Sequence, residues 1–193
     1  MQQEQIKMTE QQKFNKDEWQ TPEYFFNWLD NRFNFNIDGC AVSSNSKLPD
    51  YLGPDRGAEW MKSFLTDEIW LDLEPGFGRC SIFVNPPYSN VTPFLKQAKK
   101  LRDAGHLVVV LLNNDKSTQW YQQHIHNVAN EVIDIVGGRL AFIHPVTGEE
   151  VKGNSKGQMV VVFDPWVDDF VQRSVSLEFV KKCGGFNDRT SKI

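Results

Sequence analysis

Two uninterrupted apolar segments constrain the fold of this chain more than any other feature. They are residues 107–112, Leu-Val-Val-Val-Leu-Leu, and residues 158–163, Gln-Met-Val-Val-Val-Phe. The first is typical of a strand that is buried on both faces of a parallel sheet. Segments with helical spacing lie between the predicted strands. This alternation predicts an α/β fold with a doubly wound, mostly parallel sheet and an antiparallel ending.

Shorter apolar or alternating segments predict the remaining strands. They lie at residues 37–38, 68–73, 81–84 and 131–136, with a β-excursion at 140–151 around a Thr-Gly turn. Helices are predicted from residue 22 to 33, 58 to 64, 93 to 104, 117 to 126 and 166 to 182. Thr21 suits the N-cap of the first helix and Pro22 its first turn, and Thr92-Pro93 repeats that signal.

The chain has 193 residues, enough for one domain with a core. Residues 1–16 are rich in Gln, Glu and Lys, and we predict a disordered tail there, followed by a single domain over residues 17–193. The sequence has neither an apolar stretch of membrane-spanning length nor the apolar segment of a signal peptide. We therefore expect a cytoplasmic protein.

The cysteines and histidines do not suggest a disulfide framework or a metal site. Cys40, Cys80 and Cys183 lie far apart, without a C-x-x-C pair. His124 and His126 lack partners at metal-ligand spacing. We predict no metal ion.

Charge is unevenly distributed along the chain. Residues 1–90 hold 8 Lys/Arg against 14 Asp/Glu, whereas residues 91–193 hold 13 against 11. Any surface that contacts phosphates should therefore come mainly from the second half.

The segment Asn85-Pro86-Pro87-Tyr88 carries the strongest functional signal. It follows the predicted strand 81–84, which proline ends because it has no N–H and a fixed φ. An amide, two stiff residues and an aromatic ring would thus lie at a strand's carboxyl end, where open α/β sheets bind ligands. The segment resembles motif IV of amino-methyltransferases, which transfer a methyl group from S-adenosylmethionine to a planar amino nitrogen.

Those residue types suit that reaction. The amino nitrogen of adenine is a poor nucleophile because its lone pair is delocalised into the ring. The Asn85 side-chain oxygen and the Pro86 carbonyl can accept its two N–H groups and favour the pyramidal nitrogen of the transition state. Pro86 and Pro87 hold these acceptors in place, and Tyr88 can stack on the base. The four residues are the predicted catalytic set.

Four segments occur in the order seen in phage-type DNA N6-adenine methyltransferases, a Dam-like family. They are Asp17-Glu18-Trp19-Gln20-Thr21-Pro22, Ile37-Asp38-Gly39-Cys40-Ala41, Asn85-Pro86-Pro87-Tyr88-Ser89 and Gly138-Arg139-Leu140-Ala141-Phe142. The resemblance implies a Rossmann-like methyltransferase fold, S-adenosylmethionine as donor and adenine in double-stranded DNA as acceptor. It also implies base flipping and a phage or prophage origin, with the protein acting in the bacterial host cell.

Cofactor contacts follow from the same resemblance. Thr21 and Pro22 should lie beside the methionine end of S-adenosylmethionine. Asp38, with Cys40 in the same segment, should lie on the amino or ribose side. Asp55 is a looser candidate for the cofactor's adenine.

A competing feature is Glu74-Pro75-Gly76-Phe77-Gly78, which looks like the glycine loop of other methyltransferases. It lies only six residues before Asn85, too close for the elements that normally intervene. We interpret it as a turn that leads into strand 81–84.

Candidate DNA contacts are four basic residues near loops of the second half. They are Lys116, Arg139, Lys152 and Lys156. Arg139 lies inside a family segment, so a base or substrate-strand contact is predicted for it. Asn113, Asn114 and Asp115 follow a buried strand at the same sheet edge, where a hydrogen-bonded turn is expected.

Three alternatives remain open at this point. The same fold could methylate N4 of cytosine or a protein glutamine, although relatives that act on cytosine more often begin motif IV with Ser. The chain could also be a catalytically silent nucleic-acid-binding module on the same scaffold.

Overall fold

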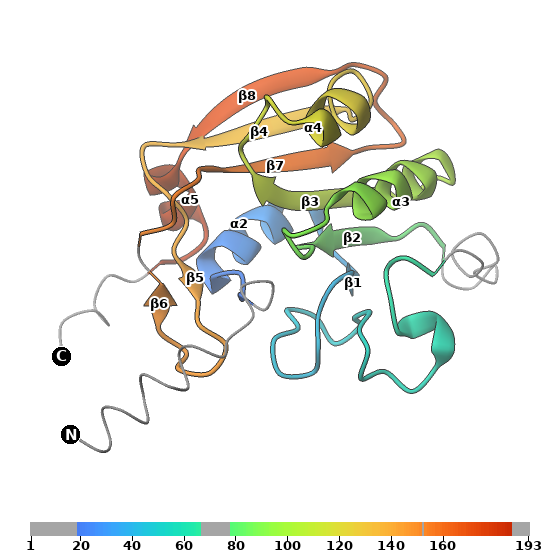
Figure 1. The fold of residues 1–193 in the computed structure, drawn as a ribbon, viewed down its shortest axis with the longest axis horizontal. Helices are drawn as coiled ribbons and strands as arrows, with labels where there is room; N and C mark the ends of the chain where they lie inside the picture. Colours follow the sequence, from blue (N-terminus) through green and yellow to red (C-terminus); the bar gives the residue numbers. More distant parts are fainter. Residues whose placement is uncertain (1–18, 67–77, 152, 187–193) are drawn as a thin grey trace.

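The computed structural model describes residues 19–66, 78–151 and 153–186 (Figure 1). In this part of the chain, six strands form one sheet in the order β1-β2-β3-β7-β4-β8. The strands are β1 (Ile37–Asp38), β2 (Ser81–Val84), β3 (Leu107–Asn113), β4 (Glu131–Val136), β7 (Gln158–Phe163) and β8 (Val171–Ser176). A separate hairpin consists of β5 (Phe142–Ile143) and β6 (Glu150–Val151). The helices are α2 (Glu23–Phe33), α3 (Thr92–Asp103), α4 (Gln119–His124), α5 (Leu177–Cys183) and the 3-10 helix η2 (Glu59–Met61).

The predicted fold class is confirmed. Strands β1, β2 and β3 are parallel, and β4 and β8 are parallel to each other. Only β7 runs against its neighbours in this sheet as described, and it lies between β3 and β4 rather than at an edge. The sheet is therefore mostly parallel, as expected of a Rossmann-like methyltransferase.

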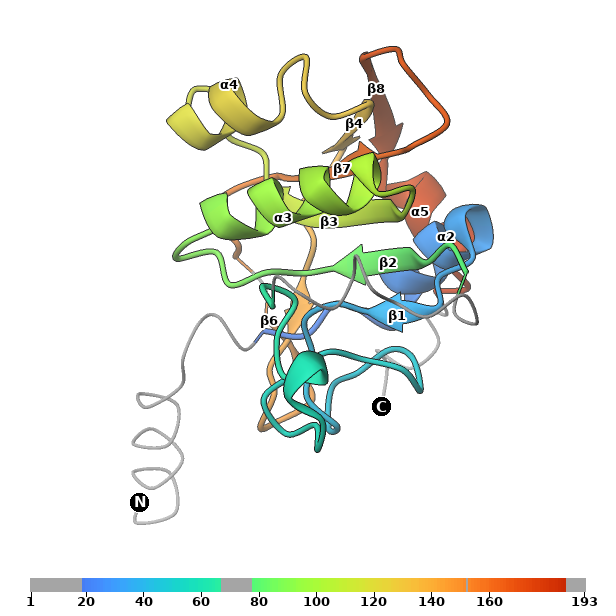
Figure 2. The same ribbon diagram turned by 90° about the vertical axis from the view of Figure 1, so that its right-hand side faces the viewer.

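Helices cover both faces of the sheet because the side chains of its strands alternate between two cores. Val108, Val110 and Leu112 of β3 join the core that includes residues of α3 and α4. Val109 and Leu111 face the opposite core, which α2 and α5 cover. Figure 2 shows the two pairs of helices on opposite sides of the strands. This double coverage explains why β3 and β7 contain almost no polar residues.

The predicted final helix over residues 166–182 is wrong. Residues 171–176 form β8, and only Leu177–Cys183 are helical. Val171 and Val175 are β-branched and pair in register with Glu131 and Ile135 of β4. The helix begins after Ser176, whose Oγ accepts the Phe179 N–H at 3.1 Å. Pairing at a sheet edge thus overrides the weak helical spacing of this segment.

The predicted threonine caps are also wrong. Helix α2 has Pro22 at its N-cap, and α3 has Val91, neither with a side-chain cap bond. The Pro22 carbonyl accepts from the N–H groups of Phe25 and Phe26, so the proline itself starts the helix. Thr21 is instead buried.

The remaining predicted elements differ mainly in length. The helix predicted at 117–126 covers Gln119–His124, and the one at 58–64 is reduced to the 3-10 turn Glu59–Met61. The β-excursion at 140–151 is confirmed as β5 and β6. The strand predicted at 68–73, the tail over 1–16 and most of the turn at 74–79 lie outside the described residues.

Candidate active site

The site is built at the carboxyl ends of β1 and β2, which stop side by side. The two strands pair in parallel, with Asp38 opposite Phe83, and the Gly39 N–H donates to the Phe83 carbonyl at 2.7 Å. Asn85 is the first residue after β2. The structure therefore places Asn85, which follows β2, beside the turn that follows Asp38.

Only one of the two polar atoms of the Asn85 side chain has a hydrogen-bond partner among the described residues. Its Nδ2 donates to the Trp19 carbonyl at 3.4 Å, which orients the amide. Its Oδ1 is buried and has no hydrogen-bond partner within the described residues. Leaving a buried acceptor unpaired costs about 1–3 kcal/mol, and such groups are rare outside functional positions. The free oxygen is available to accept a hydrogen bond from a ligand.

Tyr88 belongs to an aromatic cluster beside Asn85. Its ring meets Phe142 edge-on, with ring centroids 6.0 Å apart, and Phe142 lies 5.9 Å from Trp19. The Tyr88 hydroxyl is buried and, among the residues described, has no hydrogen-bond partner. Burial raises the pKa of Tyr88, so its hydroxyl is neutral at physiological pH. Tyr88 packs against the core and does not line either of the two cavities described below.

A cleft of about 550 Å³ opens at this edge. A second, much smaller cavity of about 40 Å³ adjoins it, and both are lined by Gln20, Cys40, Asn45 and Asn85. Small-molecule sites usually occupy about 300–1,000 Å³. The cleft is therefore large enough for a nucleoside-sized ligand, and Asn85 is one of its lining residues.

Two glycines shape the cleft because the backbone passes very close to them. A Cβ on Gly53 would lie 1.7 Å from the Ala41 carbonyl oxygen. A Cβ on Gly39 would lie 3.0 Å from a Val84 methyl group and 3.1 Å from the Phe83 oxygen. Both glycines line the cleft. A side chain at Gly53 would push apart the segments that form its wall.

Asp38 organises the loop that follows β1. It is only 3% exposed, and its oxygens accept the N–H groups of Cys40 (3.3 Å) and Lys47 (3.0 Å). Burial raises the pKa of Asp38, whereas the two backbone N–H groups and the nearby Lys47 charge oppose that rise. Asp38 also lines the smaller cavity, so its remaining lone pairs can accept from a ligand.

The other predicted cofactor residues fall into two groups. Thr21 lines the smaller cavity and Cys40 lines both, and burial raises the pKa of the Cys40 thiol well above its ordinary value. Pro22 caps α2 and lines neither. Asp55 also lines neither of the two cavities. Its carboxylate is exposed and accepts a hydrogen bond from the Ser43 N–H at 2.8 Å. That hydrogen bond lowers the pKa of Asp55.

Two of the predicted DNA contacts are already paired with carboxylates. Lys116 Nζ lies 2.8 Å from Asp134, and Lys156 Nζ lies 3.1 Å from Asp115. Arg139 is exposed and donates to the Asn154 carbonyl at 2.7 Å. Lys152 lies outside the described residues.

The expected turn after β3 is present at the same edge. Asn114 Nδ2 donates to Asp134 at 3.0 Å, and Asp115 accepts from the Ser117 hydroxyl at 2.7 Å. These side chains stabilise the turn rather than facing the cleft.

Several lining residues were missed by sequence reasoning. They are Gln20, Asn45, Lys62, Ser63, Phe64, Phe94 and Pro145. Gln20 sits inside the Trp-Gln-Thr-Pro segment and was the easiest to find. Its backbone pairs with Ile143 in both directions, at 3.0 and 2.9 Å, which ties this segment to the β5–β6 hairpin. Phe94 comes from α3, and the others come from loops whose return to the sheet has no local sequence signal.

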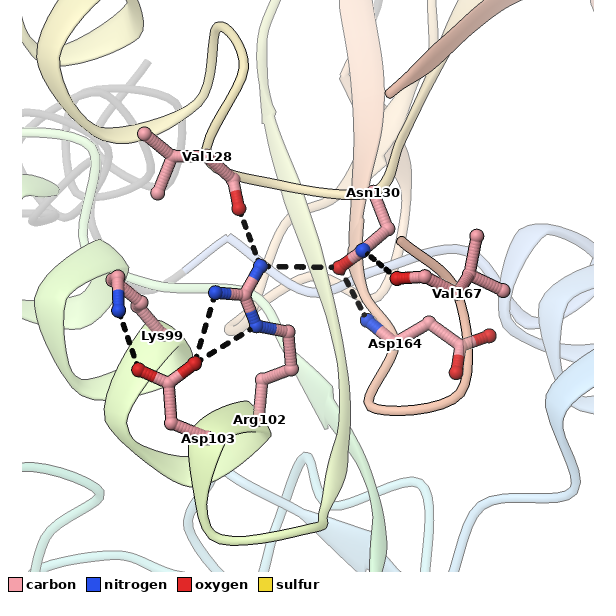
Figure 3. Close-up of polar contacts among 7 residues, drawn as sticks. All are labelled: Lys99, Arg102, Asp103, Val128, Asn130, Asp164 and Val167. Atoms are coloured by element: carbon pink, nitrogen blue, oxygen red, sulfur yellow. Dashed lines mark hydrogen bonds and ion pairs between the residues drawn. The ribbon is translucent and has the colours of Figure 1, made fainter. Parts of the chain in front are cut away.

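A larger groove, of about 840 Å³, lies at the opposite edge of the sheet. Figure 3 shows its centre, where Arg102 binds the Val128 carbonyl, the Asn130 side chain and Asp103. Asn130 Oδ1 also accepts from the Asp164 N–H at 2.9 Å, while its Nδ2 donates to the Val167 carbonyl. These hydrogen bonds fasten the strand-connecting loops to one another, and neither Arg102 nor Asn130 is left without a partner.

The described residues contain neither a metal-ligating cluster nor a helix of membrane-spanning character. No group of three or more His, Cys, Asp or Glu side chains there is arranged to hold a metal ion. None of the helices described is both long and apolar enough to span a bilayer.

Comparison with known proteins agrees with the geometry of the carboxyl edge. The family model described as DNA N-6-adenine-methyltransferase (Dam) matches residues 8–184. A DNA N-6-adenine-methyltransferase of Haemophilus phage HP1 is 35% identical over 159 residues, covering 79% of this chain and 82% of that protein. One from Escherichia phage T1 is 26% identical over 196 residues, covering 92% and 75%. The chain belongs to the phage DNA N-6-adenine-methyltransferase (Dam) family.

Proposed function

We propose that this protein transfers a methyl group from S-adenosylmethionine to N6 of adenine in double-stranded DNA, with the adenine flipped out of the helix into the cleft at Asn85-Pro86-Pro87-Tyr88. Membership of the family supports the reaction class. The observation that carries the assignment to this cleft is that Asn85 lines it and has a buried Oδ1 with no hydrogen-bond partner among the described residues.

The cleft fits the methyl donor. S-adenosylmethionine, when bound, supplies a methyl group on a positively charged sulfur, and the C–S electron pair stays with that sulfur when the group is transferred. Gly39 and Gly53 allow the close backbone approach that shapes a nucleoside-sized space. Asp38 offers a carboxylate to the ammonium or ribose hydroxyls, and Thr21 and Cys40 lie beside it.

Asn85 and Pro86 act on the adenine. The Asn85 oxygen accepts one N–H of the amino group and the Pro86 carbonyl accepts the other. Both bonds strengthen as the nitrogen becomes pyramidal and gains positive charge, so the transition state is bound more tightly than the substrate. The nitrogen then releases one proton to solvent and keeps the new methyl group.

Preorganisation accounts for the surrounding contacts. The Trp19 carbonyl holds the Asn85 amide so that its oxygen remains free. The prolines restrict the loop, and Tyr88 braces against Phe142. A positioned acceptor avoids the reorganisation that a flexible one would need at the moment of reaction.

The test is incubation of the purified protein with methyl-labelled S-adenosylmethionine and duplex DNA that lacks modified adenine, followed by mass spectrometry of the nucleosides. Labelled N6-methyladenine is the expected product. Labelled N4-methylcytosine, or label in protein alone, would support the corresponding alternatives. Absence of label from every product, with folded protein, would contradict the proposal.

A further inference from the structure

The tip of the β5–β6 hairpin displays an apolar side chain beside the cleft. Val146 is 74% exposed, more than any other large apolar residue in the described part of the chain. Its neighbour Pro145 lines the cleft together with Asn85 and Pro87. Figure 1 shows the hairpin extending away from the six-stranded sheet. The exposed valine therefore stands next to the point where a base would enter.

The base of the hairpin is fixed to the catalytic segment. Phe142 is 1% exposed and packs against Trp19 and Tyr88. Ile143 exchanges two backbone hydrogen bonds with Gln20. The hairpin thus cannot move far without disturbing the aromatic cluster beside Asn85.

The turn itself is closed by hydrogen bonds. The N–H groups of Val146 and Thr147 both donate to His144 Nδ1, at 3.2 Å each. The Gly148 N–H donates to the His144 carbonyl at 2.8 Å, and Gly148 has a φ of 69°, which a glycine adopts without strain. Val146 is consequently presented on an ordered turn, so little conformational entropy is lost when it contacts a partner.

The geometry points to Val146 as a wedge that enters the duplex and occupies the space left by the flipped adenine, an inference that rests on the proposed function. Extruding a base breaks its stacking, at a cost of a few kcal/mol, and apolar side chains inserted between base steps offset that cost. Pro145 and Val146 provide an apolar tip of suitable size at the entrance of the cleft.

The charges on the hairpin favour contact with bases over contact with phosphates. Glu149 and Glu150 are exposed on its returning strand. Carboxylates repel the DNA backbone, so these two residues do not bind phosphates. Within a groove they can accept hydrogen bonds from cytosine amino groups. Pro145 and Val146 carry no charge, so they are the part of the hairpin that can enter the helix.

The test compares Val146→Ala with the wild-type protein on two duplexes. One is an unmethylated, fully paired duplex that contains the sequence on which the protein acts. The other has an abasic site opposite the target adenine, so that less free energy is needed to flip the base. We expect Val146→Ala to slow methylation of the paired duplex about tenfold, because the variant no longer offsets part of the free energy of unstacking. On the abasic duplex its rate should lie within about twofold of wild type, and Val146→Leu should behave like wild type on both.

Val167→Ala is the matched control, because Val167 is 41% exposed but lies at the opposite edge of the sheet. It should methylate both duplexes at the wild-type rate. If Val146→Ala matches wild type on the paired duplex, or is slowed equally on both, Val146 is not a wedge. If the wild-type protein methylates neither duplex, the proposed function fails, and this inference fails with it.

Discussion

The two edges of the sheet differ in how completely their polar groups are satisfied. At the carboxyl edge, Asn85 Oδ1 and the Tyr88 hydroxyl are buried without partners among the described residues. At the amino edge of the parallel strands, Arg102 and Asn130 are each bonded to several groups (Figure 3). Yet the groove at the amino edge is the larger, about 840 Å³ against about 550 Å³.

The difference separates a structural junction from a reaction site. A satisfied network contributes stability and offers nothing to a ligand, whereas an unpaired buried acceptor costs stability and can be satisfied by a substrate. Cavity size alone would select the amino edge, whereas the unpaired buried groups favour the carboxyl edge. Substitutions at the two edges should therefore affect different quantities.

The largest effect is expected for Asn85→Ala. Loss of one acceptor for the developing ammonium should lower the rate by about 100-fold or more. Removing the unpaired Asn85 Oδ1 should stabilise the fold, and this gain offsets the loss of the Nδ2 bond to the Trp19 carbonyl, so the free energy of unfolding should not fall by more than about 0.5 kcal/mol. Single-turnover methylation and urea unfolding measure the two quantities.

Asn90→Ala is a suitable control, since Asn90 is exposed in the same loop and should keep the wild-type rate. Near wild-type methylation by Asn85→Ala would remove the central residue from the proposed mechanism.

The reverse pattern is expected for Asn130→Ala at the amino edge. Its side chain is 6% exposed and bonds Arg102, the Asp164 N–H and the Val167 carbonyl. Its removal takes one partner from Arg102 and leaves the Asp164 N–H and the Val167 carbonyl without this bond, which should lower the free energy of unfolding by about 2–3 kcal/mol. The rate per folded molecule should not change.

Asp168→Ala, an exposed substitution in the same groove, should be neutral within about 0.5 kcal/mol. A stable but inactive Asn130→Ala protein would show that the amino edge contributes to function and would break the comparison.

Sequence reasoning selected the carboxyl edge because its signals are local. Asn85 to Tyr88 follow directly on a strand, and proline marks where that strand ends. Asn130 had no such signal, because its partners Arg102, Asp164 and Val167 meet only after β4 and β7 have paired. Strand β8 was missed for the same reason, since its pairing with β4 is not encoded in its own spacing.

Asp38→Asn should separate affinity from stability within the carboxyl edge. Loss of the charge should weaken S-adenosylmethionine binding by about 1.5–3 kcal/mol if the carboxylate accepts from the ligand. In the wild-type protein the pKa of Asp38 is raised above 3.8, so the folded state binds more protons than the unfolded state just above that pH. Its contribution to stability therefore falls as pH rises through this window.

The asparagine variant lacks that titration. As pH rises from about 3.8, the variant should therefore become more stable relative to the wild-type protein. Urea unfolding at several pH values measures this difference in the free energy of unfolding. Parallel pH profiles for the two proteins would show that burial of the Asp38 charge is not costly.

Tyr88 tests the second unpartnered group. Tyr88→Ala should weaken productive binding of the flipped base by about 1–3 kcal/mol, the scale of base stacking on an aromatic ring. Tyr88→Phe should retain most activity and lose no stability, because the hydroxyl has no partner in the described structure. A phenylalanine variant as inactive as the alanine variant would assign the essential role to the hydroxyl.

The smallest effects are expected for the lysines at the carboxyl edge, where binding of DNA must compete with existing ion pairs. Because the chain's net charge is −4, we expect a shallow slope of log affinity against log salt concentration, equivalent to roughly two to five phosphate contacts. Lys116 and Lys156 already face Asp134 and Asp115, so each alanine variant should reduce that slope by less than about one.

Arg139 sharpens the contrast, since it bonds a carbonyl rather than a carboxylate and keeps its full charge for DNA. Its replacement by alanine should change which sequences are methylated, or abolish methylation, more than it changes the salt slope. Filter binding over a salt series and sequencing of methylated DNA distinguish these outcomes. An equal loss on every sequence, with a slope change of about one, would make Arg139 a phosphate contact like the lysines.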